Sequence, residues 1–152
     1  MSEMLQSEDR HRGRAQDHLP RGVDMEFYIP TETGEFAAFC AAAVAALIGL
    51  VMLFAPRLAF RAAGIGLSEG RRGGLAEARS TMGGMHVGLG LGAILLAQPM
   101  VYLAVGAAFA LAAFGRALSM MSDNGATLFN WLALAVQSAL AALPLAYVFG
   151  LI

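Results

Sequence analysis

Residues 36–54 read FAAFCAAAVAALIGLVMLF, a run of 19 residues without a charged side chain. At about 1.5 Å of rise per residue, a helix of this length crosses a hydrocarbon core of roughly 30 Å. The whole chain agrees with this interpretation, because 58% of its 152 residues are hydrophobic and 14% are charged. An ordinary soluble protein has roughly a quarter of its residues charged. The sequence therefore predicts an integral membrane protein.

Three more apolar segments follow, and the connections between them are short. The last two connections are a Gln98–Pro99 step and an SDNG turn at residues 122–125. Proline disfavours a helix at the residue before it, and Asp, Asn and Gly are typical of turns. We therefore expect an all-α fold, a four-transmembrane-helix bundle whose last three helices are antiparallel. The expected helices cover residues 36–55, 77–97, 100–121 and 127–150.

Residues 1–35 form a polar segment of mixed charge ahead of the first span. Two prolines interrupt it and it has few apolar residues to bury, so we expect a disordered or partner-ordered tail. It lacks the basic start, short apolar core and cleavage site of a secretory signal, so the first apolar segment is expected to be kept as an anchor. The chain thus divides into a tail, residues 1–35, and a transmembrane domain, residues 36–152.

The distribution of arginine predicts how the bundle is oriented. The loop over residues 56–76 carries four arginines, whereas the turn at residues 98–99 and the C-terminus carry none. Because short basic loops stay on the cytoplasmic side, we expect this loop to be cytoplasmic and both termini to lie outside. A multi-pass protein of the bacterial inner membrane is the expected setting. Arginines 10, 12 and 14 of the tail would favour the reverse orientation if they counted.

Five glycines lie between residues 83 and 92, inside the second apolar segment. At about 100° per residue, Gly84, Gly88 and Gly92 share one helical face, and Arg79, Gly83, His86 and Gly90 lie together on another. A small residue at every fourth position allows two transmembrane helices to approach closely. We therefore expect the second helix to be central in the bundle, with Gly84, Gly88 and Gly92 as a packing face.

Four charged residues are expected at one interfacial level, namely Glu77, Arg79, Arg116 and Asp123. An arginine inside a membrane segment costs roughly 2.5 to 3.5 kcal/mol at mid-depth, so each arginine needs an anionic partner or a headgroup. We expect Glu77 to pair with Arg116, and Arg79 with Asp123 or a lipid phosphate. A network that locks the fold, a lipid-headgroup site, and a substrate or ion site are the alternative roles of this cluster.

His86 and Gln137 are expected deeper in the bundle. His86 is about 10 Å beyond Arg79 along the helix, and Gln137, in the last helix, lies near enough to hydrogen-bond with it. Both a hydrogen-bonded core histidine and a proton-relay or ligand-contacting histidine fit this pattern. No second His or Cys stands at ligand spacing, so neither a metal nor another cofactor is expected. The net charge of -1 gives no reason to expect nucleic acid.

The chain also resembles a family of small bacterial four-helix membrane proteins, the domain of unknown function DUF4345. The resemblance depends on an initial apolar helix that ends in a proline, on EARSTMGGMHVGLGLGAILL at 77–96 and on GRALSMMSDNG at 115–125. It covers about residues 36–150 and implies the fold, but no activity. Met82 departs from it, because an aromatic residue is expected there. The matching positions are Glu77, Arg79, Gly83, Gly84, His86, Gly88, Arg116 and Asp123.

These features predict a non-catalytic accessory or assembly subunit, packed against a larger membrane complex through its glycines and its tail. Its expected partners are the lipid bilayer and either another membrane protein or a second copy of the chain. The alternative is a small carrier or channel that uses His86, Gln137 and the interfacial ion pairs. A membrane enzyme acting on a lipid or quinone near Arg79 and Arg116 is a third hypothesis. No catalytic constellation supports it, so we expect no enzyme.

Overall fold

A computed structural model describes residues 29–66, 73–123 and 125–152. Within these residues every regular element is a helix, which confirms the all-α fold class. Most of the predicted tail lies outside the described residues, and the first helix begins three residues earlier than expected. The elements are α2 (Thr33–Phe54), α3 (Pro56–Ala62), α4 (Gly73–Glu77), the π-helix η1 (Ala78–Gly84), α5 (Met85–Leu96), α6 (Pro99–Ser122) and α7 (Leu128–Val148).

Three of the described helices are long and apolar enough to cross a membrane. They are α2, α6 and α7, with 22, 24 and 21 residues. The chain is therefore a helical membrane protein. The helix predicted over residues 77–97 is divided, because η1 precedes an α5 of 12 residues. Alone, α5 is about 18 Å long, shorter than a hydrocarbon core of roughly 30 Å.

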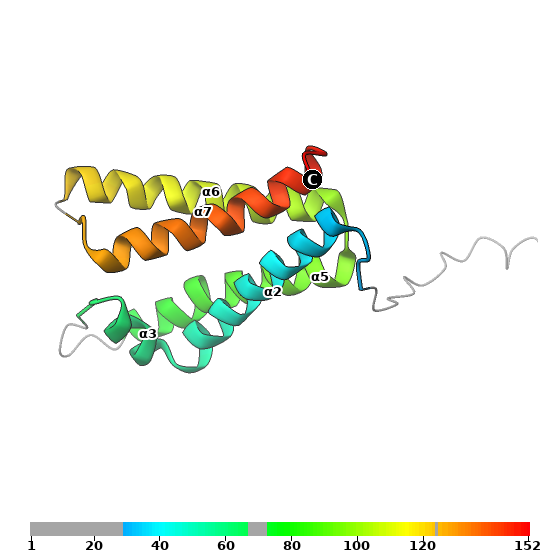
Figure 1. Ribbon diagram of the computed structural model, residues 1–152. Helices are drawn as coiled ribbons and strands as arrows, with labels where there is room; N and C mark the ends of the chain where they lie inside the picture. Colours follow the sequence, from blue (N-terminus) through cyan, green and yellow to red (C-terminus); the bar gives the residue numbers. More distant parts are fainter. Residues whose placement is uncertain (1–28, 67–72, 124) are drawn as a thin grey trace, which may run out of the picture.

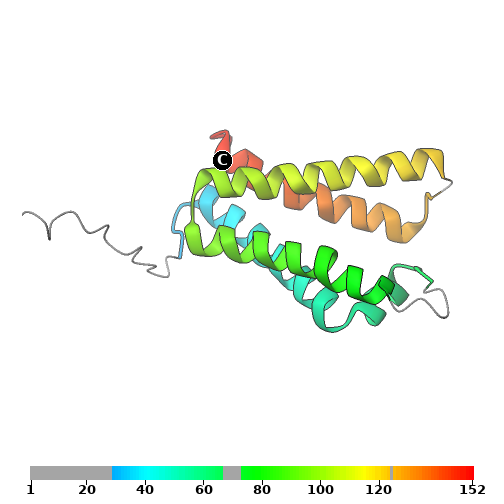
Figure 2. The same cartoon turned by 180° about the vertical axis from the view of Figure 1, so that it is seen from behind.

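The helices α2, α5, α6 and α7 lie side by side, and each runs opposite to the one before it in the chain (Figures 1 and 2). A Cβ added to Gly34, near the start of α2, would clash with the backbone of Ile152. The beginning of α2 and the C-terminus therefore share one end of the bundle. Figure 1 shows α3 and the α6–α7 turn at the opposite end. Hence α6 runs antiparallel to α5, and α7 runs antiparallel to α6, as their short connections predicted.

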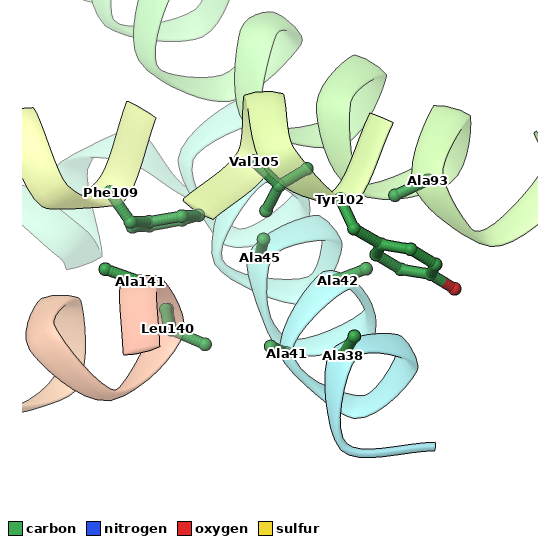
Figure 3. Close-up of a cluster of buried hydrophobic side chains, with 10 residues drawn as sticks. All are labelled: Ala38, Ala41, Ala42, Ala45, Ala93, Tyr102, Val105, Phe109, Leu140 and Ala141. Carbon is green, nitrogen blue, oxygen red and sulfur yellow. The ribbon is translucent and has the colours of Figure 1, made fainter. Parts of the chain in front are cut away.

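The most extensively packed helix is α2, whereas the prediction placed the second apolar segment at the centre. One side of α2 packs against η1 and α5, and another packs against α7. Alanines form these faces, and their short side chains allow backbones to approach closely. The core is completed by Tyr102, Val105 and Phe109 of α6 and by residues of α7 (Figure 3). The alanines of α2 in this core are Ala38, Ala41, Ala42 and Ala45.

Gly90 lies at a close approach of α5 to α2. A Cβ on Gly90 would lie 2.6 Å from the carbonyl oxygen of Ala42 and 2.7 Å from the backbone nitrogen of Ala46. Gly83 is similarly close, since its Cβ would lie 2.9 Å from the backbone nitrogen of Leu53. The pair Gly83 and Gly90, two helical turns apart, therefore forms the face that packs against α2.

The π-helical segment η1 changes which residues share a face. Its hydrogen bonds join residues five apart, and its two buried residues, Ala78 and Gly83, have this spacing. Arg79 is exposed, although a regular α-helix would place it beside Gly83 and His86. The predicted common face of Arg79 and His86 is therefore not formed.

Candidate functional site

The guanidinium of Arg116, on α6, belongs to a polar network that joins α6 to α7. Its Nε donates a hydrogen bond to Oε1 of Gln137 at 2.8 Å, and Nη1 donates to Oδ1 of Asn130 at 2.7 Å. Both acceptors lie on α7, seven residues apart and thus on the same helical face. All three side chains are half-buried. Two neutral amides therefore hold one guanidinium across the contact between α6 and α7.

Asn130 also orders the turn that joins the two helices. Its Nδ2 donates to the carbonyl oxygen of Gly125 at 2.7 Å. Its backbone N–H donates to Oγ1 of Thr127 at 3.2 Å, and this threonine is the N-cap of α7. Asn130 was not among the predicted site residues. The signal that could have identified it is its spacing of seven residues from Gln137, which places two amides on one face.

The predicted ion pairs are not formed. Glu77 accepts a hydrogen bond from Oγ1 of Thr81, and Asp123 accepts one from Oγ of Ser122 at 2.9 Å. No ion pair joins any two residues within the described parts of the chain, so the expected Glu77–Arg116 pair is wrong. The physical reason is the packing of the helices: Glu77 ends α4 beside η1, which packs against α2, whereas Arg116 lies on α6, which packs along α7.

His86 contacts α6 through its ring. The ring packs edge-on against Phe109, with centroids 5.5 Å apart and an interplanar angle of 75°. Its Nδ1 is buried and makes no hydrogen bond with the residues described. The expected bond between His86 and Gln137 is absent from the described contacts: Nδ1 of His86 has no partner, and Oε1 of Gln137 accepts from Arg116. His86 is thus a packing residue that keeps one unpaired ring nitrogen.

The structure places Gly84, at the end of η1, and Gly88 and Gly92 of α5 on the outward side of this segment. Nothing lies within 4 Å of a Cβ added to Gly88 or Gly92, and one on Gly84 would meet only a carbonyl of its own helix. The packing face expected from their spacing is therefore not used within the described chain. Met85 and Leu95 flank these glycines and are 58% and 48% exposed.

The described residues contain no group of three or more His, Cys, Asp or Glu that could hold a metal ion. Comparison with known proteins gives no identification either. No family model matches the chain, and no curated protein or solved structure matches it. The resemblance to DUF4345 therefore stays a prediction. What the geometry defines is a small helical membrane protein with one arginine held by two amides between neighbouring helices.

Proposed function

We propose that this protein is a non-catalytic accessory or assembly subunit that packs against a larger membrane complex. The observation that supports it is the open face of η1 and α5, where Gly84, Gly88 and Gly92 meet no other described segment. A leucine in a lipid-facing helix favours insertion by roughly 0.3 to 0.6 kcal/mol, which glycine does not provide. Glycines at this spacing instead present a flat backbone surface to which a second helix can lie close.

The proposed bundle crosses the membrane four times, with α4, η1 and α5 together as the second crossing. These three elements run continuously from Gly73 to Leu96. Of these, η1 and α5 lie beside α2, and α5 ends at the turn that begins α6. This arrangement is also the one that the resemblance to DUF4345 implies.

The proposed setting is the inner membrane of a bacterium, with the loop over residues 56–76 on the cytoplasmic side. Arg57 and Arg61 of α3 and Arg79 of η1 are exposed, and α3 lies at the end of the bundle away from the C-terminus (Figure 1). Arginines near the ends of spans are retained on the cytoplasmic side. Both termini of the transmembrane domain, residues 36–152, would then lie on the outer side of the membrane.

The carrier or channel alternative has less support. It would need His86 and Gln137 to act together on one path. Gln137 instead accepts a hydrogen bond from Arg116, and His86 packs against Phe109. The polar groups at mid-depth are thus engaged in separate contacts between helices, as expected for residues that stabilise a bundle.

Affinity purification from native membranes in a mild detergent tests the proposal. The wild-type chain should recover a partner in stoichiometric amount. Replacing both Gly88 and Gly92 with leucine should abolish this recovery, because the bulky side chains fill the flat face. Gly115→Leu on α6 is the matched control, since nothing lies within 4 Å of its Cβ either. It should leave the partner bound.

Two results would contradict the accessory role. One is the recovery of only a monomer or a homo-oligomer from native membranes. The other is recovery of the partner in equal amount with the doubly substituted chain. Circular dichroism of each purified variant should show unchanged helix content, so that a lost partner reflects a changed surface on α5 rather than unfolding.

A further inference from the structure

Arg116 carries a charge that its partners do not neutralise. Its hydrogen-bond acceptors, Asn130 and Gln137, are uncharged amides, and no described carboxylate forms an ion pair with it. Arginine stays protonated in proteins. The residue lies six positions before the end of α6 at Ser122, about 9 Å inside the helix. A cation at this depth is stabilised by an anion or by headgroups within its reach.

The guanidinium has donors that remain free. It carries five N–H groups, and the two amides occupy one on Nε and one on Nη1. Only two side-chain atoms in the described chain are buried without a hydrogen-bond partner, and they belong to His86 and Tyr102. The amino group Nη2 of Arg116 is therefore accessible. Because α7 holds the other two nitrogens, the orientation of the free edge is fixed.

An apolar cavity of about 220 Å³ lies in the contact between α6 and α7, and its lining begins one residue along each helix from Arg116 and Asn130. Ala117 follows Arg116 on α6, and Trp131 follows Asn130 on α7, so the cavity and the polar network share neighbouring positions on both helices. The cavity is lined by Ala117, Met120, Met121, Ala126, Trp131 and Leu134.

We propose that this place binds one anionic phospholipid. The headgroup phosphate accepts hydrogen bonds from the free N–H groups of Arg116, and an acyl chain lies in the adjoining cavity. Arginine is well suited to phosphate, because its planar edge can donate two parallel hydrogen bonds. The lipid site does not involve the glycine face of α5. Its test can therefore fail while the accessory role is confirmed, and the reverse.

Trp131 gives a direct measurement, since it lines the cavity and is the only tryptophan of the chain. Wild-type protein is reconstituted in phosphatidylcholine vesicles that contain phosphatidylglycerol, with bromine on the acyl chains of one lipid or the other. Bromine quenches tryptophan on contact. Brominated phosphatidylglycerol should quench Trp131 with roughly five-fold higher apparent affinity, the factor expected for one arginine near an anionic lipid.

Two variants assign this preference to Arg116. Arg116→Gln removes the charge and should give equal quenching by the two lipids. Arg57→Gln is the control, because Arg57 is an exposed arginine on α3 without an amide partner among the described residues. It should leave the preference at the wild-type level. Loss of the preference in both variants would indicate general surface charge and overturn the proposal.

The wild-type measurement needs no variant, so the proposal can be refuted even if Arg116→Gln fails to insert. Equal quenching of Trp131 by the two lipids in the wild-type protein would overturn it, and so would a preference that persists in inserted Arg116→Gln. Sodium phosphate is compared with sodium chloride at matched ionic strength to separate a lipid from a free anion. Specific displacement by inorganic phosphate would overturn the assignment to a lipid, whereas equal effects of the two salts support it.

Discussion

Replacing Gly90 with alanine tests the close packing of α2 against α5. The added Cβ would lie 2.6 Å from the carbonyl oxygen of Ala42, and 2.7 Å and 2.8 Å from the nitrogen and Cβ of Ala46. Ordinary contacts begin near 3.4 Å, so the helices must separate locally by about 0.8 Å, the difference between the two distances. Two of the three opposing atoms belong to the backbone, which cannot move aside by changing a rotamer.

This separation should cost more free energy than the added methyl group contributes. A buried methylene is worth about 0.8 kcal/mol, and overpacking a core typically costs about 1 to 3 kcal/mol. The displacement also loosens the other alanine contacts of α2, since the helix moves as a rigid element. We expect Gly90→Ala to lower the free energy of unfolding by about 2 kcal/mol.

Gly88→Ala is the matched control, because it makes the same change two residues away on the opposite side of α5. Nothing lies within 4 Å of its Cβ, so the free energy of unfolding should change by less than about 0.5 kcal/mol. Both variants are compared by equilibrium unfolding in mixed detergent micelles, followed by circular dichroism. Equal effects of the two substitutions, or wild-type stability of Gly90→Ala, would refute the close approach at Gly90.

Three further predictions use the same unfolding measurement. A double-mutant cycle of Arg116→Ala with Gln137→Leu should give a coupling free energy of about 1 kcal/mol, and a cycle of Arg116→Ala with Glu77→Ala should give none. Coupling to Glu77 without coupling to Gln137 would instead support the ion pair expected from the sequence. His86→Phe should be at least as stable as wild type, because it removes a buried unpaired nitrogen, whereas His86→Ala should lose about 2 kcal/mol; equal losses would contradict this. Ala97 has φ of 46°, so Ala97→Gly should gain about 1 kcal/mol, and any loss would argue against the left-handed backbone.

The first span and the last two could be predicted from local signals. Residues 36–54 contain no charge, and a charge-free run of this length predicts a span whatever surrounds it. Pro99 begins α6, where its missing N–H requires no acceptor, and Thr127 caps α7 one residue before the helix begins. These boundaries follow from the chemistry of single residues, so tertiary packing did not alter them.

The packing of the second apolar segment was harder to predict, because its glycines form two possible packing faces. Gly84, Gly88 and Gly92 repeat every four residues, and Gly83 and Gly90 are seven residues apart. Both spacings are compatible with close helix packing. The choice between them depends on how the alanines of α2 meet this segment, which is a tertiary contact. The i→i+5 turns of η1 add a rotation that a regular helical wheel does not include.

The partner of Arg116 shows why charge alone did not predict the site. Opposite charge favoured Glu77, but α6 packs along α7, so the amides of Asn130 and Gln137 are within reach. Side-chain hydrogen bonds in membrane proteins contribute about 0.6 kcal/mol each on average, so two provide about 1.2 kcal/mol. An arginine at mid-depth costs roughly 2.5 to 3.5 kcal/mol. The amides therefore orient the guanidinium without offsetting its full cost, and the remaining stabilisation has to come from the nearby interface or from an anion bound at the free edge.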